Sequence, residues 1–128
     1  MTYVTEHRAV FAVSLVKKRK IVMGFFSMLF GSAPKVDFKT VIGNGALVID
    51  VRTPQEFGSG HVKGAVNIPL STLPHKLESL KRGKAIVVYC ASGARSASAK
   101  GLLERNGFSE VYNGGGYHTL MRKLSKEG

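Results

Sequence analysis

The sequence has few groups that could cross-link the chain or bind a metal: its 128 residues include one cysteine, four histidines and no tryptophan. With Cys90 alone, no internal disulfide can form, and zinc sites or iron–sulfur clusters that need several thiolates are excluded. The histidines show no metal-ligand spacing, so we expect no metal. Cys90 is therefore either a buried small hydrophobe or a reactive thiol.

Acidic residues are also scarce. Lys and Arg number 19 against 8 Asp and Glu, which gives a net charge of +11, while the hydrophobic fraction of 44% is ordinary for a globular protein. The excess predicts attraction to anions. No basic strip interleaved with aromatics is present, so we do not expect nucleic-acid binding. The length suits one domain.

The first 33 residues form an N-terminal extension whose composition differs from the rest. Two apolar runs, residues 9–16 and 21–30, flank the basic cluster Lys-Lys-Arg-Lys at 17–20. Neither run approaches the roughly 18 to 20 residues that a membrane-spanning helix needs, so no transmembrane helix is predicted. The pattern resembles a secretory signal, but Pro34 directly follows the candidate cleavage site and makes it a poor substrate.

A third interpretation is that translation begins at Met23 and that the basic cluster is a ribosome-binding site read as protein, because Lys and Arg can have purine-only codons. The sequence thus predicts an extension at 1–33 and a folded domain at 34–128. We expect a cytoplasmic protein, or a periplasmic one if the extension is a signal.

From residue 36 onward the pattern alternates between strand and helix. Continuous apolar runs rich in β-branched residues at 46–51 and 85–89 are typical of buried parallel strands. This alternation predicts an α/β fold with helices on both faces of the sheet. Weaker strands are expected at 65–68 and 110–112, with a short edge at 35–36, and helices are expected at 37–42, 71–80, 95–106 and 117–124.

Cys90 stands where a predicted strand ends, the position at which open α/β sheets bind ligands. The loop that follows, Ala91-Ser92-Gly93-Ala94-Arg95-Ser96, has small residues that allow backbone amides to turn toward the sulfur and form an anion site at a helix N-terminus. Such surroundings lower the pKa of a thiol. Arg95 could hold an oxyanion with its planar fork. Read alone, Cys90 could equally be an inert core residue.

Three motifs in order make the chain resemble the rhodanese family of sulfurtransferases, in particular its single-domain bacterial members. These are ALVIDVRTPQEFGSGHVKGAVNIPL at 46–70, the Cys90 loop and the pair Gly115-Gly116. The resemblance implies a five-stranded, mostly parallel central sheet covered on both faces. It also implies a cofactor-free transfer in which Cys90 takes sulfane sulfur from an anionic donor such as thiosulfate, carries it as a persulfide, and passes it to cyanide, another thiol or a protein acceptor.

The same resemblance assigns substrate binding to residues 91–96. Asp50, Arg52 and His61 are expected to support the site or the fold through ion pairs and hydrogen bonds, not through catalysis. Glu56 and His61 lie in the stretch 55–62, which resembles the family's fold-defining turn. The family often has Trp shortly after the glycine pair, and Leu120 stands there in this sequence. We expect Leu120 to be a packing substitution.

Two alternatives remain open. The domain could be a binding or sulfur-relay module of the same fold, although such a module usually lacks the loop cysteine. It could also be a small phosphatase or arsenate reductase, but the spacing from Cys90 to Arg95 is Cys-x4-Arg, and related phosphatases use one more residue to cradle a tetrahedral phosphate.

Overall fold

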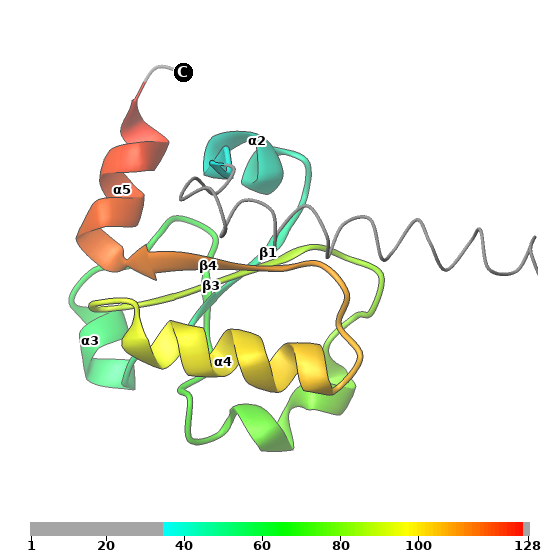
Figure 1. The fold of residues 1–128 in the computed structure, drawn as a ribbon. Coiled ribbons are helices and arrows are strands. Elements are labelled where there is room, and N and C mark those ends of the chain that lie inside the picture. Colours follow the sequence, from blue (N-terminus) through cyan, green and yellow to red (C-terminus); the bar gives the residue numbers. More distant parts are fainter. Residues whose placement is uncertain (1–34, 127–128) are drawn as a thin grey trace, which may run out of the picture. The chain divides into compact units, whose positions relative to one another are not determined.

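The structure is a computed structural model that describes residues 35–126 (Figure 1). The predictions for residues 1–33, including the signal-like pattern and a start at Met23, lie outside the described residues. Within residues 35–126, no helix is both long enough and apolar enough to cross a membrane.

The centre of the fold is a parallel sheet in the order β2-β1-β3-β4. Its strands are β1 (Leu47–Asp50), β2 (Val66–Asn67), β3 (Ile86–Cys90) and β4 (Val111–Gly116). The described part of the chain thus has four strands, and the prediction of five is wrong. Residues 35–36 form no strand there because Asp37 immediately caps a helix, which leaves two exposed residues to pair.

Helices cover both faces of this sheet, as predicted (Figure 1). Strand side chains alternate between the faces. Val88 and Cys90 of β3 belong to a cluster with α4 (Ala94–Arg105), whereas Val87 and Tyr89 belong to a cluster with α2 (Phe38–Gly43) and α5 (Tyr117–Ser125). Leu120 is fully buried in the second cluster.

The prediction of a helix at 71–80 is wrong. That segment forms two 3₁₀ turns, η1 (Leu73–His75) and η2 (Leu77–Ser79). Thr72 and Ser79 each donate their hydroxyl to a carbonyl three residues back, 3.0 and 2.8 Å away. Such local bonds compete with the α-helical pattern, and Pro74 contributes no N–H donor.

A short helix, α3 (Pro54–Gly58), lies where the sequence indicated only a turn. Thr53 and Glu56 form a capping box, in which the Thr53 hydroxyl accepts from the Glu56 amide at 3.1 Å and Glu56 accepts from the Thr53 amide at 2.9 Å. Pro54 occupies the first turn. The pattern Thr-Pro-Gln-Glu is a recognisable helix start and could have revealed α3.

Asp50 and Arg52 form an ion pair that is buried at the end of β1. Arg52 Nη2 donates to Asp50 Oδ2 at 2.7 Å, and the exposed fractions of the two side chains are 6% and 0%. Arg52 Nη2 also donates to the Gly60 carbonyl at 2.7 Å, and its guanidinium lies 4.6 Å from the Tyr117 ring centroid. The pair therefore joins β1, the loop after α3 and the start of α5.

The substitution Arg52→Met should leave the buried Asp50 carboxylate without its cationic partner and lower the free energy of unfolding by about 3–5 kcal/mol. Urea denaturation measures the loss. The control Lys100→Met breaks an exposed pair with Glu104 and should cost only about 0.3–0.5 kcal/mol. The double variant Asp50→Asn with Arg52→Met should lose less than Arg52→Met alone, since no unpaired charge remains. Equal losses for Arg52→Met and Lys100→Met would contradict a stabilising role for the buried pair.

Candidate active site around Cys90

Cys90 is the last residue of β3, and its sulfur accepts hydrogen bonds from the start of α4. The Gly93 amide donates to Cys90 Sγ at 3.0 Å and the Ser96 amide at 3.4 Å. Gly93 is the N-cap of α4 and has no side chain to accept from the first helical amides. The sulfur thus takes the acceptor role that an N-cap side-chain oxygen usually fills, beside the positive end of the helix dipole.

These contacts decide whether the pKa of the Cys90 thiol is raised or lowered. Burial raises the pKa of Cys90, but hydrogen bonds from the Ser96 hydroxyl and amide and from the Gly93 and Ser92 amides outweigh burial, so the net pKa is below its ordinary value. The Cys90 residue itself is fully buried. Ala91, Ser92 and Ala94 are exposed around it, so the sulfur lies directly beneath a surface loop of small residues.

The glycine-rich end of β4 packs against this loop at very short range. A Cβ on Gly116 would lie 2.5 Å from the Ala91 carbonyl oxygen, and a Cβ on Gly93 would lie 3.5 Å from Gly115 Cα. The register between β3 and β4 shifts at this point, because Val88 pairs with Asn113 but Tyr89 pairs with Gly115. Gly116 must be glycine because a Cβ there would collide with the Ala91 backbone, whereas Gly93 is favoured by its positive φ of 105°.

Arg95 lies in the first turn of α4 and binds a carboxylate of the chain itself. Its Nη1 and Nη2 donate to Glu56 Oε1 and Oε2 at 2.9 and 3.1 Å, and both side chains are about one third exposed, at 38% and 35%. The hydrogen bonds from Arg95 and from the Thr53 amide lower the pKa of Glu56 to about 2. The sequence separated these two residues into a substrate-binding role and a turn; the structure joins them.

The other predicted residues divide into two groups. Of residues 91–96, Gly93 and Ser96 donate to the sulfur through their amides, whereas the Arg95 guanidinium binds Glu56. The hydrogen bonds that the Asp50 and Arg52 side chains make in the described part of the chain go to each other, to the Arg52 amide and to Gly60, not to Cys90. His61 is exposed, with Nδ1 2.8 Å from the Phe57 carbonyl oxygen and its ring stacked on Phe57, which is a fold-supporting position.

Asn113 is a member of the site that sequence reasoning missed. Its Oδ1 accepts from the Ser96 hydroxyl at 2.7 Å and from the Gly115 amide at 2.8 Å, and its Nδ2 donates to the Gly93 carbonyl at 3.3 Å. It thus connects β4 to the Cys90 loop. No local pattern indicated this role, because Asn beside a glycine run is equally typical of a turn.

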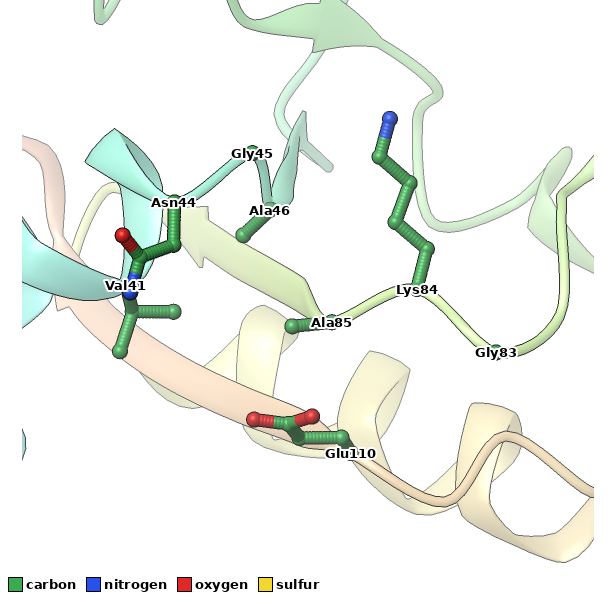
Figure 2. Close-up of a pocket in the computed structure, with 8 residues that line it drawn as sticks. All are labelled: Val41, Asn44, Gly45, Ala46, Gly83, Lys84, Ala85 and Glu110. Carbon is green, nitrogen blue, oxygen red and sulfur yellow. The ribbon is translucent and has the colours of Figure 1, made fainter.

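Two of the hollows in the described part of the chain lie at opposite ends of the sheet. One, of about 320 Å³, adjoins the site and is lined by Val51, Thr53, Pro69, Leu70, Ser71 and Arg95. A larger one, of about 490 Å³, lies where β1, β3 and β4 begin, with Ala46, Ala85 and Glu110 on its walls (Figure 2). Parallel sheets bind substrates at the carboxyl ends of their strands, which makes the smaller hollow the better candidate for a substrate site.

Among residues 35–126, no three His, Cys, Asp or Glu side chains lie together as metal ligands would. The donors within reach of Cys90 Sγ are amides and one hydroxyl, and the cationic Arg95 lies in the same first turn of α4. Such a set favours an anion and can stabilise a thiolate.

A family model described as the rhodanese-like domain matches residues 35–120. The chain therefore belongs to the rhodanese-like domain family. It is 44% identical over 68 residues to the uncharacterized protein YqhL of Bacillus subtilis, a match that covers 53% of this chain and 54% of that protein. The chain thus spans little more than half the length of that relative.

Two further relatives carry sulfurtransferase names. The thiosulfate sulfurtransferase PspE of Escherichia coli is 39% identical over 70 residues, covering 53% of this chain and 67% of PspE. The solved structure of the human single-domain sulfurtransferase TSTD1 has a TM-score of 0.64 and 27% identity, and the match covers 76% of this chain and 100% of that one.

The ion pair between Glu56 and Arg95 predicts a pH dependence of stability. The pKa of Glu56 is depressed to about 2 in the folded chain from an ordinary 4.5, so the pair stabilises fully above about pH 4.5 and is lost as the pH falls toward 2. The stability difference between the parent and Glu56→Gln should therefore shrink over that range in urea denaturation. Glu104→Gln, in an exposed helical pair, is the control. A difference that stays constant across the range would refute the assignment.

Proposed function

We propose that this protein is a sulfurtransferase in which Cys90 carries sulfane sulfur as a persulfide. The observation that supports this most directly is the convergence of the Gly93 and Ser96 amides on Cys90 Sγ at 3.0 and 3.4 Å. These donors favour an anion on the sulfur, and the net pKa of Cys90 is lowered. Thiosulfate sulfurtransferase is the name of PspE, which supports the same reaction here.

The reaction has two steps. The Cys90 thiolate attacks the outer sulfur of thiosulfate, a new S–S bond forms at Cys90, and the old S–S bond breaks with its electron pair leaving on sulfite. The acceptor, cyanide or a thiolate, then attacks the outer sulfur of the persulfide, and Cys90 leaves as a thiolate. No electrons are gained or lost overall, so neither an oxidant nor a metal is needed.

The amides have the same role in both states. The thiolate and the persulfide each carry one negative charge, and fixed donors stabilise an anion without reorganising. The chain has no second cysteine, so the persulfide cannot collapse into an internal disulfide and persists until an outside acceptor arrives.

Arg95 is the residue we propose to bind the oxygen atoms of an anionic donor. Its guanidinium already engages Glu56 with two nitrogens, so the donor must compete with that carboxylate or use the three remaining N–H groups. Because both side chains are partly exposed, such an exchange costs little desolvation. The Glu56 carboxylate thus limits how tightly Arg95 can hold an oxyanion.

Incubation with thiosulfate should add the mass of one sulfur atom to the intact protein, and later addition of cyanide should remove it. Intact mass spectrometry measures both steps. Cys90→Ser should gain nothing, and because Cys90 is the only cysteine no other thiol can mimic the result. Absence of any gain with thiosulfate and with polysulfide would leave the binding-module alternative as the better description.

The substitution Arg95→Ala should reduce kcat/KM for thiosulfate by roughly tenfold to a hundredfold, the effect of losing one charge-assisted contact. A neutral donor such as a dialkyl trisulfide should be affected much less. Arg105→Ala, at the far end of the same helix, is the control for net charge. Since the Glu56 carboxylate left behind also repels an anion, Glu56→Gln with Arg95→Ala isolates the lost contact. Equal losses for both donor types would refute the role of Arg95.

A further inference from the structure

The Ser96 hydroxyl has more acceptors within reach than it can serve. Its oxygen lies 2.7 Å from Asn113 Oδ1, 3.1 Å from the Gly93 carbonyl oxygen and 3.4 Å from Cys90 Sγ. A hydroxyl has one hydrogen to donate and two lone pairs with which to accept. Ser96 is fully buried, so the direction of this hydrogen is decided by these neighbours.

The orientation of the Asn113 amide settles that direction. The Gly115 amide lies 2.8 Å from Asn113 Oδ1, and a backbone N–H can only donate, so the atom that faces it must be the oxygen. The nitrogen then faces the Gly93 carbonyl, 3.3 Å away, and donates to it. Ser96 therefore meets an acceptor at its shortest contact and donates its hydrogen there.

This arrangement leaves a lone pair of the Ser96 oxygen facing Cys90. A protonated thiol can donate its S–H hydrogen to that lone pair. A thiolate needs a donor instead, and the Ser96 hydrogen can reach it only by leaving Asn113. The Gly93 and Ser96 amides donate to the sulfur in either state, so the hydroxyl is the part of the site that responds to the protonation of Cys90.

We propose that Asn113 is a positioning residue for the Ser96 hydroxyl. While Cys90 is protonated, the Ser96 hydroxyl donates to Asn113 Oδ1; when the thiol has lost its proton to water, the hydroxyl turns and donates to the thiolate instead. Asn113 acts through Ser96 and does not contact the sulfur. The inference rests on the proposed function in that it takes Cys90 as the reacting group. The titration of Cys90, however, can be measured without any sulfur donor.

The elements packed around the loop carry several charged or titratable groups. These are Arg95 on α4, its partner Glu56 on α3, the Asp50–Arg52 pair at the end of β1, Tyr89 on β3, and Tyr117 and His118 on α5. The variants Asn113→Leu and Ser96→Ala leave all of them unchanged. A difference in titration between these variants therefore reports the hydroxyl network.

The test is the pH titration of Cys90 by the ultraviolet absorbance of its thiolate, read as the difference from Cys90→Ser so that the four tyrosines cancel and the single cysteine gives the signal. Asn113→Leu removes the nearest acceptor and leaves the Ser96 hydroxyl with the neutral Gly93 carbonyl and the sulfur. A charged thiolate is the stronger acceptor of the two, so the midpoint should fall by about one pH unit. In the Ser96→Ala background the same substitution should leave the midpoint unchanged. Asn44→Leu, an exposed asparagine at the opposite end of the sheet, should also have no effect.

The proposal is overturned if Asn113→Leu lowers the Cys90 midpoint equally in the parent and in the Ser96→Ala background. It is also overturned if Asn113→Leu raises the midpoint in the parent or leaves it unchanged. If Asn113→Leu does not fold, the test uses Asn113→Asp, because this variant keeps an oxygen acceptor for both the Ser96 hydroxyl and the Gly115 amide. Its midpoint should rise, and by more in the parent than in the Ser96→Ala background, where only the added charge acts. A rise of the same size in both backgrounds overturns the proposal.

Discussion

The contact between the glycine-rich end of β4 and the loop after Cys90 is the constraint on which the site depends. A Cβ at Gly116 would collide with the Ala91 carbonyl oxygen, so the loop can lie this close only because the strand has no side chain there. The same approach brings Asn113 within reach of Gly93 and Ser96. The loop is thereby held in the curve that points its amides at the sulfur.

The curve of this loop places Cys90 Sγ where the side-chain oxygen of an ordinary N-cap residue would lie. Helix α4 begins at a glycine with φ of 105° and no capping side chain, and its free amide at Ser96 is satisfied by Cys90 Sγ. One set of contacts therefore stabilises the helix start and favours charge on the thiol. In such a site, a substitution that disturbs the cap changes stability and reactivity together, which is why the titration of Cys90 is a better probe of Asn113 than activity alone.

Sequence reasoning succeeded where one local pattern dominates. The strands β1 and β3 are continuous apolar runs buried on both faces, and α4 ends at Asn106-Gly107 with Phe108 packing back, so both types of element were predicted within one or two residues. It failed for short elements. Helix α3 was not predicted, although its capping box is visible in the sequence. The segment at 71–80 is not a regular helix because its side chains form hydrogen bonds that compete with the helical pattern. The edge strand expected at 35–36 was too short to pair.

The sequence by itself determined that the chain folds as a parallel α/β domain of the rhodanese type and that its one cysteine follows a buried strand beside small residues and Arg95. These are properties of neighbouring residues, and they can be read along the chain. The tertiary structure alone decided that Arg95 pairs with Glu56, 39 residues away, and that Asn113 holds Ser96. Both contacts depend on how separate strands and helices meet at one edge of the sheet, and no local pattern encodes that meeting.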